Sequence, residues 1–256
     1  MATTDWAAVF DQQFSAPPTS VEARVGRAVL GDEYPEELAP HSFVSRSELG
    51  RFVEETRLTA GAMLADVGCG RGGPGLWVAA QSGARYTGID IAPSAVQAVV
   101  ARAPALRMQG RVEAAVGTFE DTGLRDASAD AIMSIDALLF TPDKRRAVGE
   151  LARVLRRGGR LVFTSWDFSG QPQGRPPQVD DHRPLLATAG FRVLAYDDTE
   201  DWRGRMTRYS QALMDSAADV AAETGEDVEA LRRDLAQEAA TANTMIRRFL
   251  AVAERV

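Results

Sequence analysis

Short apolar runs alternate with segments of helical periodicity from residue 62 onward. The apolar runs, which have the length and composition of buried strands, are 63–67, 86–90, 112–116, 131–135 and 160–166. The segments that separate them are long enough to form crossover helices. Strands that alternate with helices in this way predict a parallel sheet with helices on both faces.

Helix boundary signals support this division. Proline suits the first turn of a helix, and Pro74 and Pro93 stand where the helices after the first and second strands are expected to begin. After the fourth strand, Thr141-Pro142 predicts the cap and first turn of a helix. Gly158-Gly159 predicts the end of that helix, directly before the fifth strand.

The segment before residue 62 looks helical and loop-like. Its clearest signal is Ser45-Arg46-Ser47-Glu48, a capping box that predicts a helix through Leu49 and Phe52. After the fifth strand, residues 167–180 are rich in Pro, Gly and Gln and predict a surface loop or lid.

The rest of the chain predicts a helix at 181–189 and a strand at 191–197, followed by two apolar stripes at helical spacing that we expect to pack in the core. The stripes are formed by Trp202, Met206, Tyr209, Leu213 and Val220 and by Val228, Leu231, Leu235 and Ile246. The end of the chain, 249–256, predicts a last strand. Because no crossover helix needs to follow it, we expect this strand to pair antiparallel.

These elements predict an α/β fold with helical additions. The expected core is a Rossmann-like, seven-stranded, mostly parallel sheet formed by residues 61–198 and 246–256. Residues 1–60 are expected to form an N-terminal helical lid. Residues 199–245 are expected to form a helical insertion that also covers the substrate.

Composition and charge narrow the class of protein. The chain has 256 residues, a net charge of −7 and a pI near 5.0, which argue against general binding of nucleic acid. The N-terminus is acidic and interrupted by polar residues, unlike a signal peptide, and no apolar run reaches the roughly 20 residues of a membrane span. The single cysteine, Cys69, suits a reducing compartment. We therefore expect a cytoplasmic protein that binds neither nucleic acid nor membrane.

The loop after the first strand carries candidate chemistry. Gly68-Cys69-Gly70-Arg71-Gly72-Gly73 matches the G-x-G-x-x-G pattern of nucleotide-binding loops. Asp90 ends the second strand, where a carboxylate can accept both hydroxyls of a ribose. These two features suit NAD and S-adenosylmethionine (SAM) equally well.

Asp66, two residues before the first glycine, separates these two cofactors. A carboxylate at this place would repel a pyrophosphate in a cleft of low dielectric constant. SAM instead presents an ammonium and a sulfonium, which are both positive. The acid therefore favours SAM.

Several motifs now resemble those of one family, the class I SAM-dependent methyltransferases. Asp66–Gly72 resembles their first signature motif and Tyr86–Asp90 their second. Val116–Asp121 follows the usual run toward the fourth strand, Leu151–Leu161 is similar to their turn from helix to strand, and Ala189–Phe191 resembles the entry to the sixth strand. The branch that looks most similar comprises bacterial small-molecule methyltransferases, as in quinone and natural-product biosynthesis.

The resemblance implies SAM as cofactor, S-adenosylhomocysteine as product and a small-molecule acceptor. It implies cofactor contacts from Asp66, Gly68, Cys69, Gly70, Asp90, Ile91, Thr118, Phe119 and Ile135. Two features depart from the family. Thr118 stands where many relatives carry an acid that accepts the adenine amino group, and the loop 136–140 lacks the histidine that relatives often place there.

The candidates for acid–base chemistry are therefore found elsewhere. His41 and His182 are the only histidines, and a histidine near its normal pKa can accept a proton at neutral pH. Asp136 follows the fourth strand, at the edge of the sheet where ligands gather. Tyr34 and Trp166 are further candidates for the pocket wall. Because the sulfonium is already activated, positioning with or without a general base can supply much of the rate.

Other functions are less well supported. The chain lacks the Asn/Asp-Pro-Pro-aromatic run of enzymes that methylate nucleic-acid amino groups, and no clustered Cys, His or carboxylates predict a metal site. One alternative is a SAM-binding enzyme of this fold that catalyses a cyclisation or rearrangement. A lesser alternative is an NAD-dependent oxidoreductase, which only the glycine pattern supports. The acceptor and the oligomeric state are not predicted.

Overall fold

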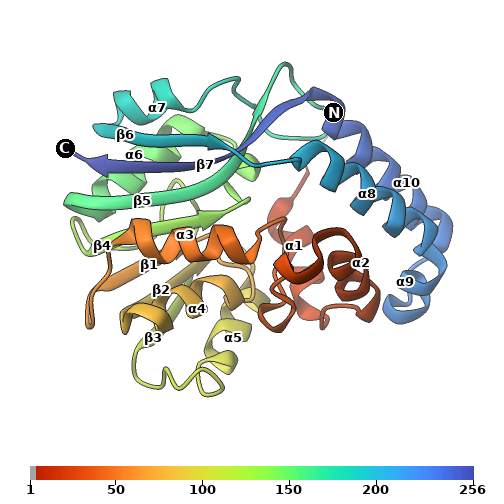
Figure 1. Ribbon diagram of the computed structural model, residues 1–256, viewed down its shortest axis with the longest axis horizontal. Helices are drawn as coiled ribbons and strands as arrows, with labels where there is room; N and C mark the ends of the chain where they lie inside the picture. The colour runs from red at the N-terminus through yellow and green to blue at the C-terminus, as the bar shows by residue number, and fades with distance from the viewer. Residues whose placement is uncertain (1–3) are drawn as a thin grey trace.

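Seven strands form one sheet in the computed structural model, which describes residues 4–256 (Figure 1). Their spatial order is β3 (Val112–Val116), β2 (Arg85–Asp90), β1 (Met63–Val67), β4 (Ala129–Ile135), β5 (Leu155–Phe168), β7 (Met245–Arg255) and β6 (Phe191–Asp198). Strands β1 to β5 pair in parallel, whereas β7 lies antiparallel between β5 and β6. The predicted mostly parallel sheet and its antiparallel last strand are confirmed.

Both faces of the sheet are buried, because successive side chains along a strand point to opposite faces. Along β7, Phe249 and Ala251 belong to one core cluster and Leu250 and Val252 to the other. The first cluster packs against helices α6 and α7, and the second against α3, α4 and α5. The bounds of these helices are α3 Arg46–Thr56, α4 Gly73–Ser82, α5 Pro93–Arg102, α6 Lys144–Val154 and α7 Arg183–Thr188. This is the predicted layered arrangement.

A helical lobe lies beside the sheet, on the right in Figure 1, and combines helices from the N-terminal part of the chain with helices from residues 202–241. Its helices are α1 Trp6–Ser15, α2 Ser20–Leu30, α8 Trp202–Asp215, α9 Ala217–Thr224 and α10 Val228–Thr241. Val21 and Val25 of α2 are buried against Val220 of α9 and the partly buried Tyr209 and Leu213 of α8. Two segments far apart in the sequence thus share one small core.

The capped helix α3 does not belong to this lobe. Ser45 and Glu48 form the predicted capping box, and Leu49 and Phe52 pack into the core cluster on the sheet. Helix α3 is amphipathic, and its apolar stripe is buried against the sheet, which explains its position. The assignment of residues 1–60 to a functional lid stays a prediction.

Two boundary predictions around α6 are wrong. Asp143, not Thr141, caps this helix, because its side chain accepts the Arg146 N–H at 2.9 Å. The helix also ends at Val154, before Gly158-Gly159. These glycines lie inside β5, where the pairing with β4 is irregular, and Gly158 has a φ of +75° that glycine tolerates.

The second apolar stripe is also shorter than predicted. Helix α10 ends at Thr241, and Ile246 lies in β7 with its side chain exposed. The pairing of β7 with β5 begins at Met245, so the sheet determines this part of the chain. Within residues 4–256, none of the helices combines the length and the apolar character needed to cross a bilayer.

Candidate active site

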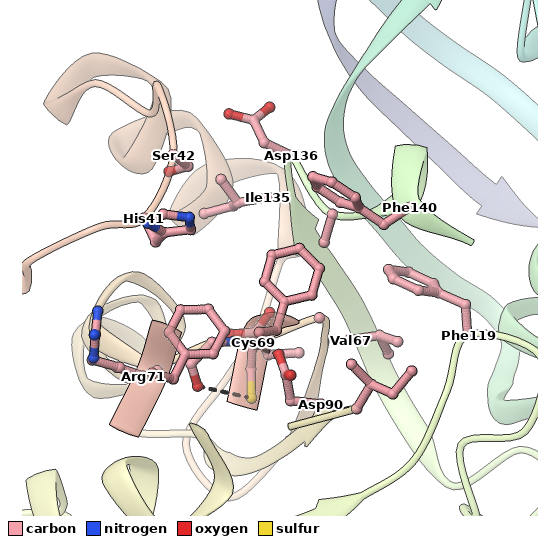
Figure 2. A pocket seen from close by; sticks show the side chains of 18 of the residues that line it. His41, Ser42, Val67, Cys69, Arg71, Asp90, Phe119, Ile135, Asp136 and Phe140 are labelled. Atoms are coloured by element: carbon pink, nitrogen blue, oxygen red, sulfur yellow. Dashed lines mark hydrogen bonds between the residues drawn. The ribbon is translucent and has the colours of Figure 1, made fainter. Parts of the chain in front are cut away.

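A pocket opens at the carboxyl ends of the parallel strands, where the strand order reverses between β1 and β4 (Figure 2). The loops after β1, β2, β3 and β4 line it, together with α1 and the segment around His41. All nine residues predicted to contact a cofactor belong to its lining: Asp66, Gly68, Cys69, Gly70, Asp90, Ile91, Thr118, Phe119 and Ile135.

The glycine loop is shaped by left-handed backbone at alternate positions. Gly68 and Gly70 have φ angles of +73° and +51°, a region that side chains disfavour. The N–H groups of Gly68 and Cys69 both donate to the Ile89 carbonyl, which ties the loop to the end of β2. A Cβ atom on Gly68 would lie 2.4 Å from Cβ of Ala137. The two loops can therefore approach closely only with glycine here.

Asp66 ends inside the protein beside this loop. Its carboxylate accepts a hydrogen bond from the Tyr86 hydroxyl at 2.9 Å, and the residue is buried and lines the pocket. Desolvation, opposed by the Tyr86 hydrogen bond and assisted by the nearby Asp90, raises the pKa of Asp66 to about 7. A positive group in the pocket would supply the countercharge that this carboxylate lacks.

Asp90 stands at the end of β2, as the sequence predicts. Its two carboxylate oxygens accept the N–H groups of Gly70 at 2.8 Å and Ala92 at 3.0 Å. Burial raises the pKa of Asp90 and these N–H donors oppose the rise. Each oxygen keeps a second lone pair, so the carboxylate can still accept hydroxyl donors from the pocket.

The loop after β3 lines the pocket on the other side of Asp90 from the glycine loop. The Thr118 hydroxyl accepts the Asp121 N–H at 3.1 Å, and the Phe119 ring lies against Gly68. Glu120 also lines the pocket, where it accepts hydrogen bonds from the Thr141 hydroxyl and the Asp143 N–H. The sequence analysis did not identify Glu120 as a pocket residue.

His41 lies in the loop before α3 and lines the pocket. Its ring meets the Phe14 ring edge-on, with centroids 5.6 Å apart. Part of the imidazole is accessible, yet protein surrounds it closely enough that desolvation lowers its pKa below the ordinary 6.5. Neutral imidazole has a lone pair that can accept a proton.

Asp136 also lines the pocket, but it is bound within the protein. Its carboxylate accepts hydrogen bonds from Nε and Nη2 of Arg248 at 3.2 and 3.0 Å, and from the Phe43 N–H at 3.1 Å. Figure 2 shows the carboxylate directed away from Asp90 and the glycine loop. Arg248 is 1% exposed and also pairs with Glu48 of α3 at 2.5 Å. Because this buried ion network engages Asp136, the residue is suited to position the loop before α3 rather than to accept a proton.

His182 is a correction to the candidate list. It is 1% exposed and lies outside the pocket lining, with Nδ1 2.9 Å from the Asp167 carboxylate. The Tyr196 hydroxyl donates to the same carboxylate, and Phe249 packs beside the imidazole. The residue follows the loop 169–181 back onto the sheet, so β5 and β6 bury it. It has no access to a substrate in this pocket.

The aromatic wall of the pocket was missed. Trp6, Phe10 and Phe14 of α1 line the pocket, as does Phe140 after β4. The i, i+4, i+8 spacing of the three α1 residues is an amphipathic stripe that could have identified them. Tyr34 and Trp166, the candidates for this wall, lie elsewhere. Tyr34 packs on Gly26, and Trp166 is buried near Arg248.

The family can now be stated. Residues 65–163, which contain the glycine loop, Asp90 and the turn into β5, match the family model described as the methyltransferase domain. Residues 65–163 thus form a methyltransferase domain, in agreement with the resemblance to the class I SAM-dependent methyltransferases. SAM is the methyl donor of this family. The resemblance that the sequence motifs indicate is confirmed.

Curated relatives of this methyltransferase chain include enzymes of secondary metabolism. The O-methyltransferase resE of Aspergillus sclerotiorum is 30% identical, over 56% of this chain and 60% of that protein. The 27-O-demethylrifamycin SV methyltransferase of Amycolatopsis mediterranei is 29% identical, over 77% of this chain and 74% of that protein. Coverage of the first relatives thus varies, and the alignment with resE spans less than two thirds of its length.

Solved structures share the fold of the whole methyltransferase chain. The 4+2 cyclase SpnF superimposes with a TM-score of 0.74 at 21% identity, covering 100% of this chain and 98% of that one. A geranyl diphosphate C-methyltransferase from Streptomyces coelicolor gives a TM-score of 0.66 at 17% identity, with 99% of each chain covered. At these identities the likeness shows the fold alone.

The residues present in this pocket fit SAM. Within residues 4–256, Asp66 is a buried carboxylate without a cationic partner, and SAM carries two positive groups. Asp90 offers free lone pairs at the strand end where a ribose is held in such folds. Phe119 offers an apolar ring for a flat base. The donors and charges of this end therefore match the cofactor that the family uses.

Proposed function

We propose that this chain transfers the methyl group of SAM to a hydroxyl oxygen of a small molecule of secondary metabolism, with His41 as the proton acceptor. Two relatives named above support transfer to oxygen, since one is called an O-methyltransferase and the other acts, by its name, on an O-demethylated rifamycin. The pocket has room beyond the cofactor residues, bounded by α1, His41 and the turn after β4.

The observation that carries this proposal is the state of His41. Its imidazole lines the pocket, and desolvation lowers its pKa from the ordinary 6.5, which favours the neutral ring. A neutral imidazole with an accessible face can take a proton from a hydroxyl. Asp136 cannot serve equally well, because its carboxylate already neutralises Arg248.

Each part of the pocket has a role in this reaction. When bound, SAM supplies an electrophilic methyl group on a sulfonium. Asp66 and Asp90 would hold the cofactor, and the aromatic wall would exclude water from the acceptor. The hydroxyl oxygen gains the methyl group and loses its proton to His41. In this proposal residues 1–60 and 199–245 act as covers, with α1 closest to the acceptor.

The test is the variant His41→Gln, assayed with methyl-labelled SAM and a panel of neutral phenols. We expect kcat to fall roughly 100-fold, the scale of general base catalysis, with an unchanged dissociation constant for S-adenosylhomocysteine. At saturating SAM, the wild-type kcat should decline only below about pH 6.5, and this acid limb should disappear in the variant. Ser42→Ala, a neighbouring change in the pocket lining, is the control and should retain activity. An unchanged kcat in His41→Gln would exclude the base role.

A second candidate is a cyclisation or rearrangement of a substrate beside bound SAM. It is favoured by the fold likeness to the SpnF cyclase over the whole chain and by the absence of a histidine from the loop 136–140. Product analysis separates the two candidates. Methyl transfer adds a labelled methyl group to the product and yields S-adenosylhomocysteine in equal amount, whereas cyclisation leaves the mass and SAM unchanged.

A further inference from the structure

The acceptor end of the pocket is walled by mutually packed aromatic rings. Phe140 meets Trp6 and Phe10 edge-on, with ring centroids 4.8 Å apart in both pairs. Phe10 in turn stacks on Phe14 at 5.9 Å. Such packed rings present a rigid apolar surface, which favours apolar ligands and loses little side-chain entropy on binding.

Cations that could receive an anionic ligand are scarce at this end. Among residues 4–256, the only lysine or arginine in the lining is Arg71, which belongs to the glycine loop at the cofactor end. Its Nη2 donates to the carbonyls of Gln13 and Ala16, at 2.8 and 2.6 Å, and its guanidinium lies over Phe14. Figure 2 shows Arg71 on the opposite side of the pocket from Phe140.

The cations behind the wall have partners within the protein. Arg175 lies against the rings of Trp6 and Phe140 but pairs with Glu238 of α10 at 2.5 Å. Lys144 donates to the carbonyls of Leu139, Thr141 and Pro177. Both groups lie outside the pocket lining, and Nη1 of Arg175 is buried without a hydrogen-bond partner among residues 4–256.

Arg248 is likewise engaged, by Asp136 and Glu48. The remaining ionisable groups at this end are acidic or neutral. Asp136 is a carboxylate in the lining, Glu120 of the loop after β3 borders this end through the Thr141 hydroxyl, and desolvation lowers the pKa of His41, which favours its neutral form. An anionic group placed here would lose its hydration without gaining a cationic partner, which is unfavourable in a site of low dielectric constant.

We propose that the acceptor is a neutral molecule with a flat or aromatic apolar body, and that this end of the pocket rejects acceptors bearing a phosphate or carboxylate. The inference rests on the proposed methyl transfer, because it concerns the acceptor of that reaction. It follows from the aromatic wall and from the pairing of the surrounding cations. A neutral hydroxyl also matches a neutral proton acceptor at His41.

Two probes with the same apolar body test the charge preference directly. Naphthol and naphthyl phosphate are titrated calorimetrically into the full chain saturated with S-adenosylhomocysteine. We expect naphthol to bind and naphthyl phosphate to bind at least about tenfold more weakly. Equal or tighter binding of the phosphate would overturn the proposal, and so would a failure of naphthol to bind to the saturated protein.

Two neighbouring variants of α1 locate the binding. Trp6→Ala removes the ring of the wall that packs on Phe140 and should weaken naphthol binding roughly tenfold while S-adenosylhomocysteine affinity is unchanged. Val9→Ala, an exposed position on the same helix, should change neither affinity. Equal effects of the two variants on naphthol would contradict the assigned wall.

The proposed function fails separately from this charge preference. Preferential naphthol binding without transfer of the label to any neutral phenol would contradict methyl transfer and leave the charge preference intact. Transfer of the label to phenols that carry a carboxylate as readily as to neutral ones would contradict the charge preference and leave methyl transfer intact.

Discussion

The two ends of the pocket are built in different ways. The cofactor end consists of loops that directly follow β1, β2 and β3, and each contributes residues close to its strand. The acceptor end combines α1, the loop before α3 and the turn after β4, and Arg248 from the last strand holds two of these segments together. The first end depends on local sequence, and the second on contacts between distant segments.

Their electrostatics differ in the same way. At the cofactor end, Asp66 is buried with a hydroxyl partner and no cation, and its pKa is raised. At the acceptor end, Asp136 is buried with the guanidinium of Arg248. An unpaired buried acid can bind a cationic ligand, whereas a paired acid can only organise its surroundings. Asp66 is therefore the acid suited to bind a ligand, and Asp136 is the acid that stabilises the fold.

The largest effect is expected at Arg248. Arg248→Met leaves Asp136 and Glu48 without their shared cation, so the free energy of unfolding should fall by about 3–5 kcal/mol. Arg192→Met is the control, since Arg192 of the neighbouring strand β6 is exposed and pairs at the surface with Glu254. It should cost less than about 1 kcal/mol. Urea denaturation of both variants measures the difference.

Arg248→Lys sharpens this test if the methionine variant does not fold. Lysine keeps the charge but lacks the fork that contacts Asp136 through two nitrogens. The variant should bind S-adenosylhomocysteine as the wild type does, while its affinity for naphthol falls. Equal losses of both affinities would show that the two ends are not independent.

The next largest effect is expected at Asp90. Asp90→Ala removes the carboxylate that faces the ribose position and also orients the Gly70 N–H. Hydrogen bonds to a charged group contribute about 1.5–3 kcal/mol, so SAM should bind roughly 10- to 100-fold more weakly. Glu113→Ala, which removes an exposed acid of the adjacent β3, should leave the affinity unchanged. Calorimetric titration that found no difference between the variants would disprove the assignment of Asp90.

The cofactor end could be predicted from the sequence because its signals are local. Asp66, Gly68 and Gly70 lie within one loop, and Asp90 is found by its distance from that loop and by the end of an apolar run. Parallel strands place such loop residues at one edge of the sheet. The prediction therefore needed the order of the strands but no long-range packing.

The acceptor end could not be predicted in the same way. Nothing near Asp136 in the sequence indicates that Arg248 neutralises it, because the pairing depends on β7 inserting beside β5. His182 lies next to a loop in the sequence, but the folding of that loop onto the sheet buries it. The Asp136–Arg248 pair joins residues 112 positions apart, whereas His182 is buried by Asp167, 15 residues before it, and by Phe249 of β7.

The same distinction explains the errors in the fold. Gly158-Gly159 resembles a helix terminator, yet the pairing of β5 with β4 draws these residues into a strand. Ile246 continues a helical stripe in the sequence, yet it lies in β7, which pairs with β5. Sheet pairing overrode the local propensity in both places.

The central claim, that Asp66 makes this glycine loop a site for a cationic cofactor, predicts that binding depends on pH. The pKa of Asp66 is about 7 without cofactor, and a bound cation must lower it, so binding near neutral pH expels a proton. The Tyr86 hydroxyl and Cys69 thiol beside it have pKa values raised well above their ordinary range and keep their protons. Asp66→Asn retains every other titrating group, including Asp90 and the amine of SAM.

Calorimetric titration of SAM into the wild type and Asp66→Asn at about pH 6 and about pH 8 tests this claim most directly. We predict that the wild type binds SAM roughly tenfold more tightly at the higher pH, with proton release near neutrality, and that Asp66→Asn binds more weakly without this change. Equal affinity of the wild type and the variant for SAM at both pH values would contradict the claim. Binding of NADH in place of SAM would contradict it as well.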